Sequence, residues 1–246
     1  MMINLIPNFV KKNNNRFIMN ILIIGATSGI GNNLWRHYCS TGNMVSVVGR
    51  RHDELDKMVN IAPDNTMSFQ CDISDLDSFN TAFCSIINKM KTIDIAVVCA
   101  GIGELNPKLD IKTEINTLKV NVNGWTNCVN TIYNQFMSQG KGHLVTITSI
   151  GGLQPTPIAP AYSASKAFQI NYTKSLQKKS KGIGVMVTEI RPGLIDTRMA
   201  KGEGLFWVMP LADATAAVIK AIDKEKKRTI INNRWRIINF LLRHFT

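Results

Sequence analysis

Tyr162 and Lys166 are the two residues whose types and spacing most directly indicate chemistry. On a helix, positions i and i+4 share a face, so the phenol and the ammonium would point into the same space. A nearby cation lowers the pKa of a tyrosine towards working pH, as a general acid/base requires. Ser149 follows an apolar run thirteen residues earlier, where its hydroxyl could hydrogen-bond a substrate oxygen that develops charge. The alternative is an amphipathic helix surface on which a Tyr and a Lys meet by chance.

A glycine-rich segment, Gly25-Ala-Thr-Ser-Gly29-Ile-Gly31, lies between the first apolar run and a stretch with helical spacing. Glycines there let the backbone turn tightly and let a pyrophosphate approach the free N–H groups of a helix N-terminus. The spacing G-x-x-x-G-x-G differs from the commoner G-x-G-x-x-G, and any tight turn can carry glycines. We expect a dinucleotide phosphate site here, with a plain strand-to-helix turn as the alternative.

The second apolar run ends at Gly49, and two arginines, Arg50 and Arg51, follow it. A carboxylate at this point would hold the adenosine ribose and select NAD, whereas arginines suit a 2′-phosphate. The sequence therefore favours NADP(H) over NAD(H), unless one or both arginines are solvated loop residues. Asp72, after the third run, could accept from the adenine amino group or could cap a turn.

Short apolar runs rich in Val and Ile recur along the chain and predict strands buried on both faces. They span residues 20–24, 44–48, 66–70, 93–98, 143–148 and 184–190, with a weaker run at 228–232. Helical spacing separates them at 30–40, 76–89, 118–138, 161–180 and 212–224. This alternation predicts an α/β, doubly wound (Rossmann-type), mostly parallel seven-stranded sheet with helices on both faces. No linker or repeat divides it, so we expect a single catalytic domain over residues 19–232.

With the glycine segment, the serine and the Tyr–Lys pair in this order, residues 20 to about 224 resemble the short-chain dehydrogenase/reductase (SDR) family. The resemblance implies an oxidoreductase that interconverts a carbonyl and a secondary alcohol by hydride transfer, with tyrosine acid/base catalysis. It implies a catalytic tetrad of Asn121, Ser149, Tyr162 and Lys166. The cofactor-binding positions are Gly25, Ser28, Gly29, Ile30, Gly31, Arg50, Asp72, Ile73, Ala100, Gly101, Tyr162, Lys166, Pro192, Ile195 and Thr197.

The resemblance also implies roles. Lys166 would bind the nicotinamide ribose and, with Asn121 and a water, form a proton relay to Tyr162. The P-G-x-x-x-T segment at 192–197 would hold the nicotinamide carboxamide. The chain departs from the family pattern at Ile24, where a threonine is usual, and at Cys99, within a stretch that usually reads Asn-Asn-Ala-Gly. We expect Cys99 to be a buried strand cysteine and not a nucleophile.

The net charge of +12 belongs mostly to the two ends of the chain. Residues 1–18 carry +3 and residues 220–246 carry +6, whereas the body, 19–219, carries only +3. A nucleic-acid-binding body is therefore not indicated. Five scattered cysteines without a C-x-x-C pair, and four histidines without ligand spacing, argue against a metal site and for a reducing, cytoplasmic compartment.

The two ends and one loop leave alternatives open. We expect residues 1–18 to be a disordered basic extension and 233–246 to be a basic amphipathic helix that packs on its own domain or on a partner subunit, or lies peripherally on a membrane. The short segment from 198 to about 212 is either a lid with an apolar tip at 205–209 or a loop packed on the body. We expect a small-molecule carbonyl or alcohol substrate and a homo-oligomer, a dimer or tetramer. The alternative functions are a non-catalytic nucleotide-sensing protein and a membrane-associated lipid-ketone reductase.

Overall fold

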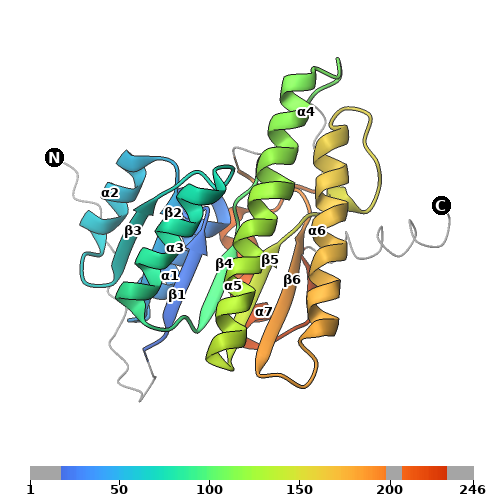
Figure 1. Ribbon diagram of the computed structural model, residues 1–246. Helices are drawn as coiled ribbons and strands as arrows, with labels where there is room; N and C mark the ends of the chain where they lie inside the picture. Colours follow the sequence, from blue (N-terminus) through green and yellow to red (C-terminus); the bar gives the residue numbers. More distant parts are fainter. Residues whose placement is uncertain (1–17, 198–206, 232–246) are drawn as a thin grey trace.

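The seven predicted strands form one parallel sheet in the order β3-β2-β1-β4-β5-β6-β7 (Figure 1). The computed structural model describes residues 18–197 and 207–231. The strands are β1 (Asn20–Ile24), β2 (Met44–Gly49), β3 (Thr66–Gln70), β4 (Ile95–Val98), β5 (Gly142–Ile147), β6 (Val185–Pro192) and β7 (Arg228–Ile231). The predicted fold class is confirmed, and every strand pair in the described sheet is parallel.

Helices cover both faces of the sheet (Figure 1). On one face lie α3 (Leu76–Met90), α5 (Trp125–Gln139) and α6 (Pro160–Lys179), packed on strand residues such as Leu22 and Ile24. On the other lie α1 (Gly29–Ser40), α2 (His52–Ile61) and α7 (Leu211–Asp223), packed on residues such as Ile21 and Ile23. Successive strand residues point to opposite faces, so a central strand must be apolar at every position.

The helix before β5 is longer than predicted. The sequence predicts it over 118–138, but the helical path begins with α4 (Ile111–Leu118), continues through the π-helical turn η1 (Lys119–Gly124) and runs on as α5. Ile111, Ile115 and Leu118 recur at helical spacing, but all three are exposed, and the one buried residue of α4 is Thr117, so this helix does not pack an apolar face on the core. At Gly124 a Cβ would lie 2.3 Å from the Ile73 carbonyl oxygen, so the helix contacts the turn after β3 directly.

Several predictions about the ends concern residues outside 18–197 and 207–231. They are the basic extension, apart from Ile18, the amphipathic helix at 233–246 and much of the segment proposed as a lid. Within the described ranges, no helix is both long and apolar enough to cross a membrane.

Candidate active site

The glycine-rich turn after β1 has a backbone path that side chains would block. Gly25 has φ +86°, and a Cβ there would lie 2.7 Å from the Ala100 backbone nitrogen. A Cβ on Gly31 would lie 2.4 Å from the Gly25 carbonyl oxygen. Gly29 begins α1, with Ser28 as its extended N-cap. The turn therefore presents bare backbone at a helix N-terminus, and this cradle fits a dinucleotide pyrophosphate.

The two arginines after β2 have different surroundings. Arg51 donates from Nη2 to Thr27 Oγ1 at 2.8 Å and from Nε at 3.2 Å, so its guanidinium lies over the glycine-rich turn. The Arg50 side chain is 58% exposed and lies 3.5 Å from an Asp72 carboxylate oxygen. At Gly49 a Cβ would lie 2.7 Å from the Thr27 methyl group. The end of β2 is thus crowded by Thr27 at Gly49 and is followed by two cations, with no carboxylate at 49–51.

Asp72 caps a turn, one of the two roles predicted for it. Its Oδ1 accepts from the backbone N–H of Ser74 at 2.9 Å and from the Ser74 hydroxyl at 2.8 Å. Burial alone would raise the pKa of Asp72, but these hydrogen bonds and Arg50 together lower it below its usual value. The ionised carboxylate therefore fixes the loop after β3 and holds Arg50 beside the turn.

Ser149 and Tyr162 meet at the carboxyl end of β5. Ser149 is the N-cap of a short 3-10 helix, η2 (Ile150–Gly152), and its Oγ accepts from the Gly151 N–H at 3.0 Å. The same hydroxyl hydrogen-bonds the phenol of Tyr162, in the first turn of α6. Glu114 of α4 fixes that turn because its Oε2 accepts from the Ala161 N–H at 3.0 Å, at a helix N-terminus where an anion is favourable.

Burial dominates the electrostatics of the Tyr162–Lys166 pair. It raises the pKa of Tyr162, and the hydrogen bond with Ser149 opposes this without cancelling it. Burial also lowers the pKa of Lys166 to about 8, while Cys99 acts in the opposite direction. The predicted lowering of the tyrosine pKa is therefore not found in the protein alone, although the ammonium lies 5.9 Å from the ring centroid. The phenol is held protonated, in the form that can donate to a carbonyl oxygen.

Asn121 lies in the π-helical turn, fully buried. Its side-chain amide accepts from the Ile102 N–H and donates to the Ile102 carbonyl, both at 2.8 Å, and also donates to Ser165 Oγ at 3.1 Å. The amide thus ties the loop after β4 to α6. Single π turns inside α-helices often accompany functional sites.

The segment after β6 returns to the glycine-rich turn. Thr197 Cγ2 lies 3.6 Å from the position of a Cβ on Gly29. Ile195 is buried and pairs with Met209 in an isolated parallel bridge. The structure therefore brings the predicted positions of both cofactor motifs and the tetrad to the carboxyl edge of the sheet. Within the described residues, no group of three or more His, Cys, Asp or Glu side chains could hold a metal ion.

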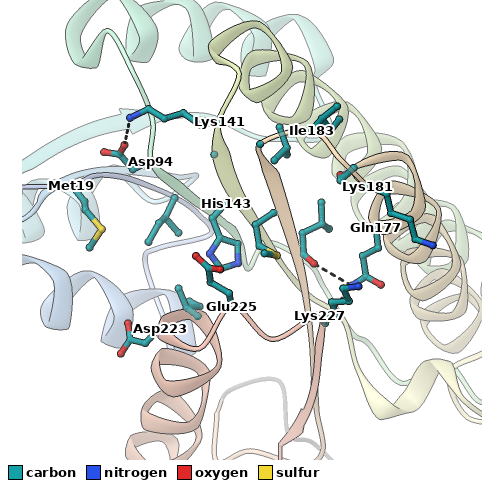
Figure 2. Close-up of a pocket in the computed structure, with 18 residues that line it drawn as sticks. Met19, Asp94, Lys141, His143, Gln177, Lys181, Ile183, Asp223, Glu225 and Lys227 are labelled. Atoms are coloured by element: carbon teal, nitrogen blue, oxygen red, sulfur yellow. Dashed lines mark hydrogen bonds and ion pairs between the residues drawn. The ribbon is translucent and has the colours of Figure 1, made fainter.

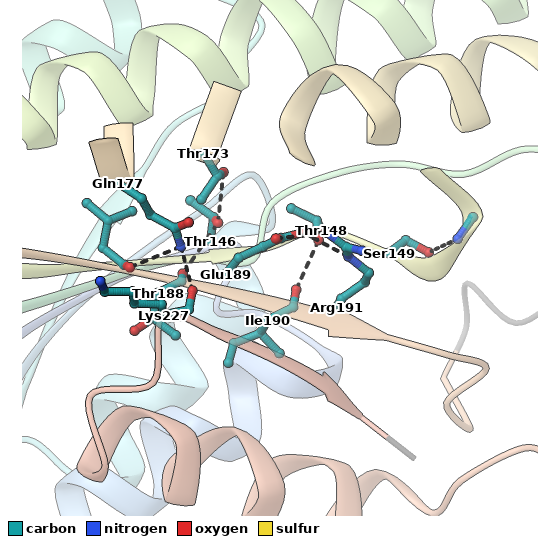
Figure 3. A network of polar contacts seen from close by, with 12 residues as sticks. Thr146, Thr148, Ser149, Thr173, Gln177, Thr188, Glu189, Ile190, Arg191 and Lys227 are labelled. Atoms are coloured by element: carbon teal, nitrogen blue, oxygen red, sulfur yellow. Dashed lines mark hydrogen bonds and ion pairs between the residues drawn. The ribbon is translucent and has the colours of Figure 1, made fainter. Parts of the chain in front are cut away.

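A buried polar network supports the end of β5 beneath Ser149 (Figure 3). Glu189 and Arg191 of β6 form an ion pair at 2.7 Å, and both side chains are 0% exposed. The Thr148 hydroxyl donates to Glu189 Oε1 at 3.0 Å. Because Thr148 directly precedes Ser149, the ion pair fixes the strand end that carries Ser149.

A hollow of about 620 Å³ lies at the opposite, amino edge of the sheet (Figure 2). It is lined by the first residues of β4, β5 and β6 and by charged side chains such as Asp94, Lys141 and Glu225. His143 lines it and pairs with Thr188 Oγ1 at 2.7 Å. None of the predicted site residues lines this hollow, so it is separate from the tetrad.

Three residues that lie in the glycine-rich turn, or contact the predicted site residues or their chain neighbours, were not proposed from the sequence: Thr27, Glu114 and Gln169. Arg51 was considered there together with Arg50. Gln169 follows Lys166 by three positions on α6, a helical spacing that could have indicated contact. Thr27 and Glu114 carry no such local signal because their partners are far away in the sequence.

Comparisons with known proteins agree with this geometry. The family model described as short chain dehydrogenase matches residues 19–205. An NADP-dependent 3-hydroxy acid dehydrogenase of Salmonella typhi is 27% identical over 180 residues, which cover 72% of this chain and 73% of that protein. A short-chain dehydrogenase from Streptomyces avermitilis superposes with a TM-score of 0.80 at 23% identity, over 92% of both chains. A serine dehydrogenase complexed with NADP+ superposes with a TM-score of 0.76 at 25% identity, over 83% of this chain and 89% of that one.

Proposed function

The chain belongs to the short-chain dehydrogenase family of oxidoreductases, and we propose that it is an NADP(H)-dependent enzyme that interconverts a carbonyl and a secondary alcohol. The observation that carries this proposal is the hydrogen bond between Ser149 and the Tyr162 phenol, with the Lys166 ammonium buried beside the ring. A neutral phenol within reach of a second hydroxyl can bind one carbonyl oxygen from two sides.

The chain's own residues would then act as follows. The nicotinamide, when bound, supplies or accepts the hydride. Ser149 orients the substrate oxygen and donates a hydrogen bond that strengthens as negative charge develops on it. Tyr162 gives its proton to that oxygen during reduction and takes it back during oxidation. Lys166 stabilises the phenolate that remains after the proton has left.

The preference for NADP(H) is supported by the surroundings of Gly49. A side chain there would meet Thr27, while Arg50 and Arg51 place two guanidinium groups next to the turn. Guanidinium groups bind phosphate oxygens in a fork geometry. The Salmonella relative is itself named as NADP-dependent.

The test is a panel of carbonyls and alcohols, including 3-hydroxy acids, aldehydes, acyl thioesters and lipid ketones, followed by NADPH absorbance. On any accepted substrate, Tyr162→Phe should reduce turnover by about 10²- to 10⁴-fold, the usual contribution of a general acid/base. The variant should still bind NADPH, measured by fluorescence titration. Full turnover by Tyr162→Phe would contradict the proposed role.

A further inference from the structure

Gln169 joins two members of the tetrad through its side-chain amide. It lies on α6 and is 0% exposed. Its Oε1 accepts from Lys166 Nζ at 2.9 Å, and its Nε2 donates to the Asn121 carbonyl oxygen at 2.8 Å. Both ends of the amide are therefore satisfied inside the protein, as a buried polar group requires.

Asn121 offers that carbonyl in a fixed position. Its own side chain is engaged with the Ile102 backbone and with Ser165, so neither end of the residue can turn freely. The resemblance to the family implies a relay in which a water joins Lys166 to Asn121. In this chain a protein side chain makes the two hydrogen bonds that connect them.

The ammonium is surrounded mainly by neutral groups. From β5, the Ile147 carbonyl accepts from Nζ at 3.4 Å, a longer contact than that with Gln169. From the end of β4, the Cys99 thiol interacts with the charge, and from α6 itself Tyr162 faces it. The π-helical turn contributes Asn121, held through Gln169. An ammonium has three N–H donors, so Gln169 and Ile147 leave one for the cofactor ribose, while Tyr162 is influenced by the charge alone.

We propose that Gln169 is a positioning residue that orients the Lys166 ammonium and links it to the Asn121 carbonyl, in the place where the family relay would use a water. The amide orients the ammonium and does not conduct a proton, because its N–H groups do not ionise at working pH. The catalytic consequence rests on the proposed function, whereas the hydrogen bonds themselves do not.

Two variants should move the pKa of Lys166 in opposite directions. Gln169→Leu removes the nearest acceptor and should lower the pKa of Lys166 by about 1. Gln169→Glu places a carboxylate there and should raise the pKa of Lys166 by between about 1 and about 3. The pKa is measured in the cofactor-free protein from the lysine ¹³Cε resonances. The Lys166 signal is assigned by its loss in Lys166→Arg.

Kinetics give the second measurement. The alkaline limb of kcat/KM for carbonyl reduction should move to lower pH in Gln169→Leu and to higher pH in Gln169→Glu, because Lys166 is needed in its charged form. The KM for NADPH should change less than kcat. If Gln169 had only a structural role, both variants would lower the amount of folded enzyme and leave the alkaline limb of kcat/KM at its native pH.

Gln177, eight residues later on α6, provides the matched control. Its amide is also committed to backbone carbonyls, those of Val187 and Lys227, away from the tetrad (Figure 3). Gln177→Leu should lower stability and leave the Lys166 pKa and the pH profile unchanged.

The proposal is overturned if Gln169→Leu and Gln169→Glu leave the pKa of Lys166 where it is in the native protein, or move it in the same direction. If Gln169→Leu does not fold, Gln169→Glu alone decides, since it keeps an acceptor oxygen in place. If no carbonyl is reduced by the native enzyme, the proposed function fails. The titration of Lys166 still tests whether Gln169 positions the ammonium.

Discussion

The carboxyl edge of the sheet carries polar side chains bound to one another, whereas the amino edge carries a hollow lined by charges with weaker partners. Ser149 hydrogen-bonds the Tyr162 phenol, Lys166 hydrogen-bonds Gln169, and the Lys166 ammonium lies 5.9 Å from the Tyr162 ring centroid. At the amino edge, the ion pair between Lys141 and Asp94 is 3.7 Å long and its lysine side chain is 69% exposed. Exposed pairs of this kind contribute little to stability.

This difference shows why a hollow by itself does not locate a site in an α/β protein. Strand ends at the carboxyl edge meet helix N-termini, whose free N–H groups and partial positive charge bind anions. The amino edge has a hollow, but within the described residues no helix N-termini meet the strand ends there. The comparison predicts that changes to the tetrad and the cofactor motifs at the carboxyl edge alter chemistry, that changes to the buried ion pair beneath them alter stability, and that changes at the amino edge alter stability without altering chemistry.

The largest effect should come from breaking the ion pair beneath Ser149. Glu189→Gln leaves the buried Arg191 charge without its carboxylate partner, and we expect a loss of about 3–5 kcal/mol in the free energy of unfolding. Urea denaturation measures it. The double variant Glu189→Gln/Arg191→Met should recover part of the loss. A change below about 1 kcal/mol would show that the carboxyl edge does not depend on this pair.

Removing the Ser149 hydroxyl should affect chemistry and leave the fold intact. Ser149→Ala deletes the partner of the Tyr162 phenol and should reduce kcat/KM by about 10²- to 10³-fold, with little change in melting temperature. Ser163→Ala is the control, because that hydroxyl bonds the Pro160 carbonyl within the same helix. If Ser149→Ala and Ser163→Ala had similar kcat/KM values, the special role proposed for the Ser149 hydroxyl would be wrong.

At the outer part of the carboxyl edge, the effect should be on cofactor choice. Arg50→Asp replaces a cation by the carboxylate that suits a free ribose, and should weaken NADPH binding by about 10- to 100-fold while NADH binding holds or improves. Fluorescence titration gives both dissociation constants. Arg36→Ala, an exposed arginine of α1, is the control. Tighter binding of NADH than of NADPH by the native protein would remove the basis of this prediction.

The smallest effect concerns His143 at the amino edge. Burial lowers its pKa from 6.5 to about 4, so the unfolded chain binds a proton below pH 6.5 that the folded chain does not bind until about pH 4. Stability is therefore lost as pH falls through this window, by about 2 kcal/mol at pH 5. His143→Gln should flatten the loss in urea titrations between pH 7 and pH 5 and leave turnover unchanged. An equally steep loss in the variant would assign the acid sensitivity to other groups.

Much of the site could be predicted because its signals are local. Apolar runs located the strands, and the resemblance to the family assigned the tetrad to positions that the structure brings to one edge. The family and fold class are confirmed by the comparisons. The roles of individual residues stay predictions until the variants are measured.

What the sequence could not give depends on three-dimensional surroundings. The raised pKa of Tyr162 follows from burial, which no spacing reveals. Thr27 meets Arg51 across 24 residues, and Glu114 reaches Ala161 across 47. The helix α4 was not predicted although Ile111, Ile115 and Leu118 recur at helical spacing; that these residues lie exposed and not on the core is visible only in the structure.

The π-helical turn does not tolerate insertions or deletions, whereas surface loops do. A π turn holds more residues than an α-helical turn, so deleting one residue between Lys119 and Gly124 would let the wide turn close to 3.6 residues per turn. Asn121, inside the turn, would then lose its place beside Ile102, while Trp125 in α5 would keep its place in the core. Alignments with relatives should therefore carry no gap here, and insertions belong in the loops around it.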